Sequence, residues 1–287
     1  IIYHGIEVLI IMKSTKKLLT AIIAILIFIS PPVAILRSMA VLSAYNALNS
    51  KNSVMEKNGF KIKIPGGFST AESDWYPFVS TFNDNAGIRK FTGNEDLSLS
   101  IMYNFPSYSP LRGCSKIFDP SSPYCSGFYG AYAVQDKNGI YGFNPDGSVN
   151  SETASQIPQF DMQNLVLGAM GLDRKNMVFD WKITNAEDNI TYAGYEGWSR
   201  IDSDLKVNSV CHNYEKFSIS YLQYGIPNYD ITRDFTPIQM YGRVYAKYFK
   251  EYDSSIFFYI MVPDKNVLES CDRDILSKSK IYPSDSE

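Results

Sequence analysis

The alternation of apolar and polar residues predicts two half-buried strands in the first part of the chain. Phe60, Ile62 and Ile64 alternate with lysines, and a Pro-Gly-Gly turn follows. Residues 97–105 alternate over a longer run, with a large apolar side chain at every second position. Because successive side chains of a strand point to opposite faces, each stretch is expected to bury one face of a sheet.

Shorter extended stretches predict further strands and the turns between them. A strand is expected at 88–91, followed by a hairpin turn at 92–96. In the second half of the chain, strands are expected at 177–184 and 191–201, separated by a turn at 185–189. Residues 206–226 are mostly extended in pattern.

Three segments carry helical patterns. The clearest is 236–252, where Thr236-Pro237 supplies a capping hydroxyl and a proline for the first helical position. Apolar residues then recur every three or four positions up to Tyr252, which predicts one apolar helix face. Helices are also expected at 158–172 and at the end of the body, at 264–280.

The order of these elements predicts the fold class. Residues 255–262 are continuously apolar, which predicts a central strand buried on both faces. Strands followed by helices at the end of the chain indicate an α+β protein, an antiparallel sheet flanked by helices in an α/β sandwich. The range 106–176 is rich in Pro, Ser and Gly and contains a hairpin pattern at 136–148, so it is predicted to be a loop-rich insertion.

The N-terminal part resembles an export signal. Residues 12–44 begin with Met12 and several lysines, continue with a predominantly apolar core of 12 residues from Leu18 to Ile29, and end with small residues. This core is shorter than the roughly 20 residues that cross a bilayer. If the following prolines are tolerated, the segment would remain as an N-terminal membrane anchor. The alternative, a buried core helix, leaves the lysines unexplained.

The segments around this signal complete the predicted organisation. Residues 1–11 are interpreted as translated leader of a bacterial gene, because the codons of Glu7-Val8 can form a ribosome-binding sequence just before Met12. His4 is therefore set aside. A short helix or spacer is expected at 45–58. The remaining expectations are a single extracytoplasmic α+β domain at 59–280 and a polar tail at 281–287.

The charge of the exported body limits its partners. Residues 1–40 contain four basic residues and one acidic residue, so the rest has 27 − 4 = 23 basic and 30 − 1 = 29 acidic residues, a formal charge of −6. An acidic body is a poor counterion for phosphate, which argues against nucleic acid as a partner. Contact with a membrane is expected only through an uncleaved N-terminal segment.

Four cysteines lie beyond the predicted signal: Cys114, Cys125, Cys211 and Cys271. An even number in an oxidising compartment suggests two disulfides, with three possible pairings. The favoured pairing joins Cys114 to Cys125 across a Pro/Ser-rich loop and Cys211 to Cys271. The alternative is four unpaired thiols.

No motif in the body predicts a catalytic or metal centre. Cys211 and His212 are adjacent, but neighbouring residues of a strand point to opposite faces, so they would not form a nucleophilic dyad. The close cysteine spacing of a zinc site is absent, as are the Gly-rich phosphate loop and the serine nucleophile elbow. No cofactor and no metal are expected. Paired carboxylates for sugar hydrolysis remain open, since acidic residues are scattered.

The best binding candidate is the stretch 191–200. If this stretch is extended, Tyr192, Glu196, Trp198 and Arg200 share one face with a glycine. The glycine leaves room beside two aromatic rings and an acid–base pair, which would suit the floor of a groove for a glycan or peptide. The alternative is that the two aromatic residues belong to the core and the charged residues form a surface pair.

Two terminal segments resemble a known family. The opening FKIKIPGGF at 60–68 resembles the first strand of the PsbP-like family, although Phe68 stands where that family has Trp. The closing residues 275–280 resemble its last helix. The resemblance covers these two motifs and the element order between them. It implies an antiparallel sheet flanked by helices and a non-catalytic binding or assembly role, and it carries over no site residues.

Taken together, the sequence predicts an exported or membrane-anchored bacterial protein that acts as a non-enzymatic extracellular binding or assembly module. A cell-envelope glycan or protein is the expected partner. The alternative is an extracellular hydrolase of cell-wall or other polymer that uses carboxylates not identifiable from sequence.

Overall fold

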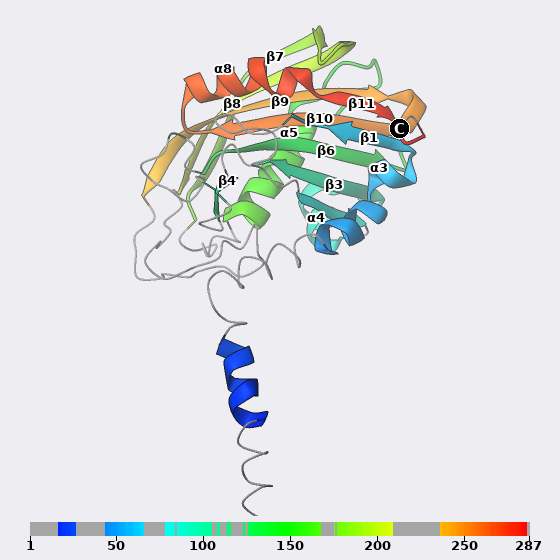
Figure 1. Ribbon diagram of the computed structural model, residues 1–287. Coiled ribbons are helices and arrows are strands. Elements are labelled where there is room, and N and C mark those ends of the chain that lie inside the picture. Colours follow the sequence, from blue (N-terminus) through cyan, green and yellow to red (C-terminus); the bar gives the residue numbers. More distant parts are fainter. Residues whose placement is uncertain are drawn as a thin grey trace, which may run out of the picture.

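The computed structural model describes residues 17–26, 44–65, 78–83, 85–104, 108–109, 114–115, 123, 126–167, 175, 177–208 and 236–285. Within these residues, the main sheet has seven strands, and all neighbouring strands are antiparallel (Figure 1). Their order across the sheet is β2 (Phe78–Asn83), β3 (Leu97–Asn104), β6 (Phe128–Asp136), β10 (Ser254–Val262), β9 (Pro237–Phe249), β8 (Tyr195–Asn208) and β7 (Phe179–Tyr192).

Helices cover both faces of this sheet, so the predicted α+β class is confirmed. One face packs against α4 (Ala86–Thr92), α5 (Ser151–Phe160) and the π-helix η3 (Asp161–Val166). The other face packs against α3 (Val54–Lys57), α8 (Lys265–Asp274) and a two-stranded sheet. The smaller elements are the two-stranded sheets β1 (Phe60–Lys63) with β11 (Lys280–Pro283) and β4 (Tyr108–Ser109) with β5 (Cys114–Ser115), and the 3-10 turns η5 (Lys250–Tyr252) and η6 (Leu276–Lys278).

Strand β10 separates the two hydrophobic cores. All nine of its residues are buried, as the continuous apolar run predicts. Phe257 and Tyr259 contribute to the core under α4 and α5, whereas Ile256 and Phe258 contribute to the core under α8. This division follows from the alternation of side chains along a strand that is covered on both faces.

The helix predicted at 236–252 is wrong, because residues 237–249 form strand β9. β9 pairs with β8 on one side and with β10 on the other. Val244 packs into one core and Tyr245 into the other, so apolar residues occur on both faces of the strand. In a strand covered on both faces, hydrophobic spacing no longer distinguishes a strand from a helix.

Two other predictions are wrong because side chains that cap helices were not recognised in the sequence. Residues 86–92 are a helix, not a strand followed by a hairpin, because the Asn85 side chain caps its start and Gly93 ends it in a left-handed conformation. The helix predicted at 158–172 begins earlier, at Ser151, where the Asn150 side chain accepts a hydrogen bond from Thr153 N. Pro158 therefore lies inside helix α5 rather than at its start.

The range 106–176, predicted as a loop-rich insertion, supplies a central strand of the main sheet. β6 lies between β3 and β10, and its sequence FYGAYAVQD lacks the polar alternation that would have revealed it. In the predicted hairpin at 136–148, Asp136 ends β6 and residues 137–148 turn without forming a strand pair, apart from one bridge between Phe143 and Val149. The insertion is therefore integrated into the sheet.

Strands β7 and β8 form one long hairpin whose turn lies at Ala193-Gly194, with φ angles of 48° and 82°. The turn predicted at 185–189 belongs to β7, which accommodates it through shifts in register. The predicted strand 191–201 is consequently divided between two antiparallel strands.

The segments at the two ends of the body, which were predicted to be a spacer and a polar tail, both take part in the fold. Residues 44–51, in the predicted helix or spacer, are helical and cover the outer edge of β2: Asn46 and Asn49 side chains accept hydrogen bonds from Val79 N and Thr81 N at 2.8 and 2.9 Å. The predicted closing helix ends at Asp274, and strand β11 lies partly in the predicted tail.

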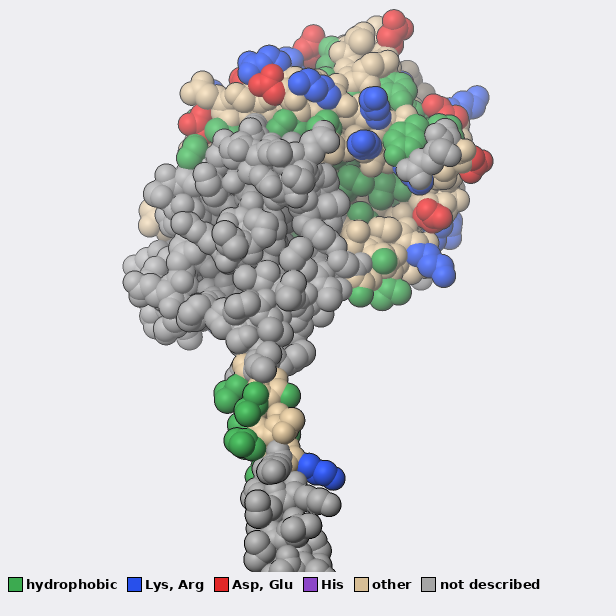
Figure 2. Space-filling model, viewed as in Figure 1, with side chains coloured by type: hydrophobic (Ala, Val, Ile, Leu, Met, Phe, Trp, Pro, Cys, Tyr) green, Lys and Arg blue, Asp and Glu red, His purple; other side chains and the backbone are tan. Residues whose placement is uncertain are grey.

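Residues 17–26 form a helix with exposed apolar side chains (Figure 2). Figure 1 draws this helix apart from the sheet. Among the helices described, none is both long and apolar enough to cross a membrane. The most exposed large apolar side chains in the helix are Leu18 and Ile25.

Candidate functional site

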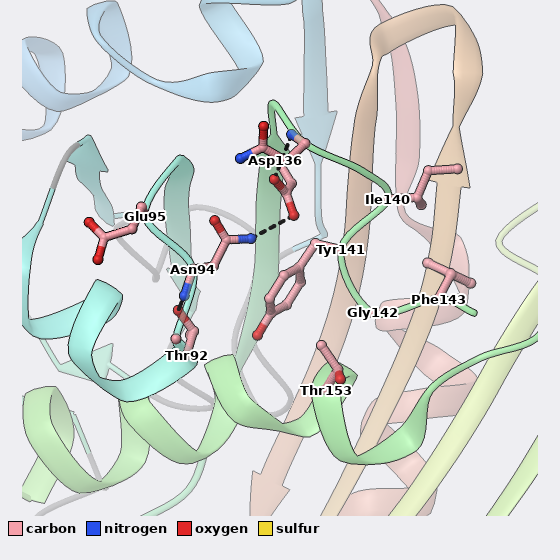
Figure 3. A pocket seen from close by; sticks show the side chains of 11 residues that line it. Thr92, Asn94, Glu95, Asp136, Ile140, Tyr141, Gly142, Phe143 and Thr153 are labelled. Atoms are coloured by element: carbon pink, nitrogen blue, oxygen red, sulfur yellow. Dashed lines mark hydrogen bonds between the residues drawn. The ribbon is translucent and has the colours of Figure 1, made fainter. Parts of the chain in front are cut away.

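A pocket with a volume of about 480 Å³ lies where α4, β3, β6 and α5 meet (Figure 3). This volume falls within the range of roughly 300–1,000 Å³ that is typical of small-molecule sites. The chain segment between β6 and α5 closes one side of it. The described residues that line it are Thr92, Gly93, Asn94, Glu95, Asp136, Asn138, Ile140, Tyr141, Gly142, Phe143 and Thr153.

Two glycines shape the pocket walls. Gly93 has φ of 70° and turns the chain from the end of α4 toward β3. Gly142 has φ of 86°, and a Cβ there would lie 3.1 Å from the Phe257 ring and 3.4 Å from Ala154 Cβ. Both positions therefore favour a residue without a side chain. They hold the 92–95 and 137–143 segments on opposite sides of the opening.

A hydrogen-bond network connects the polar lining. Asn94 Nδ2 donates to Asp136 Oδ2 at 2.6 Å, and the Asn138 backbone N–H donates to Asp136 Oδ1 at 2.9 Å. Asn138 Nδ2 donates to Asp96 Oδ2 at 2.8 Å. These bonds join the start of β3 to the end of β6 and fix the orientation of the amide and carboxylate groups around the opening.

One side of the pocket is polar and the other is partly apolar. Figure 3 shows Asn94 and Asp136 on one side of the Tyr141 ring, and Ile140 and Phe143 on the other. The Tyr141 hydroxyl donates to Gln156 Oε1 at 3.2 Å. Burial first, and the nearby Asp136 charge second, raise the pKa of Tyr141 well above its usual value, so the hydroxyl stays neutral.

Among the described lining residues, none carries a positive charge, whereas Glu95 and Asp136 are acidic. Arg89 lies 3.7 Å from the Glu95 carboxylate, whose side chain is 84% exposed. The arrangement therefore suits a neutral or cationic ligand that both donates and accepts hydrogen bonds. It does not suit a phosphate or a carboxylate ligand.

The four residues predicted as a binding face do not share one surface. Trp198 is fully buried and Tyr192 is 8% exposed, so both rings belong to the core under α8. Glu196 is exposed, and Arg200 forms ion pairs with Glu187 and Asp202 at 3.1 and 3.2 Å. The turn at Ala193-Gly194 separates Tyr192 from the other three, which lie on β8.

Tyr192 instead takes part in a buried network that the sequence did not predict. Its ring stacks on Tyr245 with centroids 3.5 Å apart, and both hydroxyls donate to the Asp272 carboxylate, at 2.6 and 2.7 Å. Arg243 Nη1 also donates to Asp272, at 2.6 Å. Burial, and then the Asp272 charge, raise the pKa of both tyrosines, so they remain hydrogen-bond donors.

A second buried carboxylate lies on the opposite face of the sheet, at the junction of α5 and η3. Asp161 is fully buried and accepts hydrogen bonds from the Tyr103 and Tyr132 hydroxyls. Burial raises the pKa of this carboxyl to about 7, although the two hydrogen bonds oppose the rise.

The stability of the protein should consequently depend on the protonation of Asp161. An aspartate in the unfolded chain has a pKa of about 3.9, so between about pH 4 and pH 7 the folded state binds the proton more tightly. As the pH rises from about 4 to about 7, we therefore expect the free energy of unfolding to fall. This one carboxyl group should account for up to roughly 4 kcal/mol of the decrease. Urea denaturation of the wild type and of Asp161→Asn at several pH values tests this, because the variant should lose the dependence. The same slope in both proteins would contradict it.

The predicted disulfide between Cys211 and Cys271 is not formed, because Cys271 carries a free, buried thiol. It lies on α8 in the core on that face, where burial raises its pKa well above the usual value and keeps it unreactive. Cys125, Cys211 and His212 lie outside the described residues, so the predicted Cys114–Cys125 pairing does as well.

Comparison with protein-family models, with curated proteins and with solved structures gives no match to this chain. Within the described part of the chain, no three His, Cys, Asp or Glu side chains come together as a metal site would require. The sequence had placed residues 136–148 in a hairpin and did not identify the pocket. The only signal for it was the clustering of Asn and Gly residues at 138–142 beside acidic side chains.

Proposed function

We propose that this protein is an exported, non-enzymatic binding module whose ligand occupies the pocket between α4, β6 and α5. The observation that supports this proposal is the pocket lining. Amide and carboxylate groups are held by hydrogen bonds on one side of the pocket, and partly exposed apolar side chains line the other side. Pockets that combine apolar walls with a few oriented polar groups are the usual small-molecule sites of proteins.

A glycan of the cell envelope is the ligand class that this lining favours. Sugar hydroxyls donate and accept hydrogen bonds, and Asn94, Asn138 and Thr153 offer groups of both kinds. The apolar face of a sugar ring needs an apolar contact, which Phe143 and the 45% exposed Ile140 provide. The acidic residues of the lining argue against anionic ligands.

Export is part of the proposal and has its own support. The helix at 17–26 exposes apolar side chains and follows a lysine-rich stretch, as a signal or an N-terminal anchor would. The resemblance of the opening strand motif at 60–68 to the PsbP-like family supports a non-catalytic role, whereas residues 275–280 form a 3-10 turn and the start of β11 and do not match the last helix of that family. Whether the N-terminal segment is cleaved decides between a released and a tethered module.

A hydrolase is the second candidate, because two carboxylates, Glu95 and Asp136, line the same pocket. Glycoside hydrolysis uses a pair of carboxylates on either side of the scissile bond. Asp136→Asn separates the two candidates. In a hydrolase this change abolishes turnover of a polymer substrate, whereas in a binding module no turnover is present to be lost.

Isothermal titration with soluble peptidoglycan fragments and neutral oligosaccharides tests the binding proposal. We expect Thr153→Val, which removes a lining hydroxyl without changing its size, to weaken binding about three- to tenfold, the value of one hydrogen bond. Asn138→Ala should weaken it at least as much. Asn185→Ala, at an exposed position of β7, is the matched control and should bind as the wild type does. Equal affinity in all four proteins would place the ligand elsewhere.

A further inference from the structure

Strand β7 forms one edge of the main sheet. It is the last strand on its side and, among the described strands, pairs only with β8 (Figure 1). The opposite edge, on β2, is covered by residues 44–51, whose Asn46 and Asn49 side chains accept hydrogen bonds from N–H groups of β2. An edge strand that is not covered in this way can pair with a strand of another chain.

Only the first part of β7 has the regular geometry that such pairing requires. Residues 179–183 pair with β8 without interruption, whereas the register shifts between Ile183 and Asn185 and at two further places between Glu187 and Tyr192. Bulges bend a strand and disrupt its ladder of hydrogen bonds, so the second part of β7 is a poor template for another strand. We call residues 179–183 the open edge segment.

The open edge segment has an apolar face and a charged face. Phe179, Trp181 and Ile183 are half-buried and pack against the core under α4 and α5. Asp180 and Lys182 point to the other face of the strand, and both residues are exposed. Each of the three apolar side chains therefore keeps some surface that a neighbouring strand could bury.

The charged face already places opposite charges across from each other within one chain. Asp180 is opposite Lys206 of β8, and Lys182 is opposite Asp204 of β8. Opposite charges at directly opposed positions stabilise a strand pair, and like charges destabilise it. On this face the charges therefore alternate along each strand and also across the pair.

We propose that two copies of this chain associate through the open edge segment, with their β7 strands antiparallel about a two-fold axis at Trp181. In this register Asp180 of each copy is opposite Lys182 of the other copy, so the alternation of charges continues from one sheet into the next. Phe179 is opposite Ile183, and Trp181 is opposite its own counterpart. Directly opposed side chains lie on the same face, so each half-buried apolar residue gains an apolar neighbour.

The charges of the open edge segment exclude the neighbouring registers. A shift by two residues places Asp180 opposite Asp180 in one direction, and Lys182 opposite Lys182 in the other. A shift by one residue places charged side chains opposite apolar ones, on the wrong face. A lysine in an edge strand usually prevents pairing with other chains, and here it favours a partner with an acidic residue at the matching position. A second copy of this chain meets that requirement twice.

Sedimentation velocity of the full chain in neutral detergent tests the proposal. Five residues from each copy form a small interface, so we expect a weak dimer with a dissociation constant of about 10–100 µM. Asp180→Lys places lysines opposite each other at both charged pairs of the interface, and Lys182→Asp places aspartates there. Each variant alone should dimerise at least tenfold more weakly than the wild type. An equimolar mixture of the two should recover the wild-type affinity, because every lysine then faces an aspartate.

Lys137→Asp is the matched control, because it reverses a charge at an exposed position outside β7 and should dimerise as the wild type does. All variants keep the N-terminal helix, so association through that helix would be the same in each of them. Dimerisation of both single variants with wild-type affinity would overturn the proposal. A mixture that associates no better than its components, or a wild type that stays monomeric up to about 500 µM, would overturn it as well.

Amide hydrogen exchange of the wild type supplies a readout that needs no substitution. Raising the protein concentration should slow exchange within residues 179–183, because their outward backbone groups become paired in the dimer. Exchange at residues 184–190 should stay unchanged, because the register shifts keep this part of β7 out of the interface. Association that protects other segments and leaves 179–183 unchanged would place the interface elsewhere and overturn the proposal.

Discussion

Gly130→Ala should prevent folding. Gly130 is the third residue of β6, opposite Tyr103 of β3 and Tyr259 of β10. A Cβ at this position would lie 1.8 Å from the Met102 carbonyl oxygen and 2.8 Å from the Tyr259 hydroxyl. The carbonyl belongs to the backbone of the adjacent strand, so relief requires separation of β3 from β6. We expect a loss above about 4 kcal/mol, beyond the range of ordinary substitutions.

Soluble expression, circular dichroism and urea denaturation measure this effect. Gly139→Ala is the matched control, because Gly139 has no atom within 4 Å of the added Cβ and is exposed. Its stability should stay within about 0.5 kcal/mol of the wild type. A Gly130→Ala protein with a wild-type midpoint would contradict the strand order β3-β6-β10.

Asp272→Ala should produce the largest loss of stability among substitutions of charged residues. The Asp272 carboxylate accepts hydrogen bonds from Tyr192, Tyr245 and Arg243, and it is only 9% exposed. Its removal leaves the Arg243 guanidinium with only Asp202 and the more exposed Glu269, and leaves two buried hydroxyls without their acceptor. Breaking a buried pair on one side costs about 3–5 kcal/mol.

Asp274→Ala is the matched control for this prediction. Asp274 lies two residues further along the chain, is exposed, and pairs with Arg273 at 2.6 Å on the surface. An exposed ion pair of this kind contributes little, so its removal should leave the denaturation midpoint unchanged. If both variants lost the same stability, the Tyr192–Tyr245–Asp272 network would not be a source of stability.

Tyr245→Phe separates the hydrogen bonds from the packing. The ring of Tyr245 stacks on Tyr192, and phenylalanine keeps that contact while removing one donor to Asp272. A smaller loss, about 0.5–1.5 kcal/mol, is expected. The loss of stability should therefore be largest in Asp272→Ala, smaller in Tyr245→Phe and absent in Asp274→Ala. This order would show that the stability comes from the Asp272 carboxylate and the groups that donate hydrogen bonds to it.

The candidate pocket shows why the site was not predictable from sequence. Its walls come from 92–95, 136–143 and Thr153, segments that lie far apart in the chain or were predicted as turns. Its two carboxylates, Glu95 and Asp136, are not distinguished in the sequence from the many other acidic residues, and only the pairing of β3 with β6 places Asn94 beside Asp136. Two of the four residues predicted as a binding face, Tyr192 and Trp198, are large aromatics, and such side chains are commonly buried in the core.

The strands with a simple hydrophobic pattern were determined by the sequence itself. β1 buries alternate residues and β10 is buried throughout, so their patterns predict both the strand and its faces. β3 buries the apolar side chains of its alternating pattern, but Ser100 and Asn104 on its other face are buried as well, so its pattern predicts the strand and only one of its buried faces. Together with the helical closing segment, they are sufficient for the α+β class. The sequence is sufficient for these strands because each face of a strand is in contact with the same surroundings, core or solvent, along most of its length.

Other strands form only because of tertiary structure. Their own sequence patterns favour a different conformation, or favour no conformation in particular. β9 has helix-like spacing and a helix-like start, yet pairing with β8 and β10 satisfies its backbone hydrogen bonds as a strand. β6 has no distinct pattern and is fixed by its two neighbours and by the close approach at Gly130. Backbone pairing between distant segments outweighs weak local preferences, because each strand gains its hydrogen bonds and burial only from the assembled sheet.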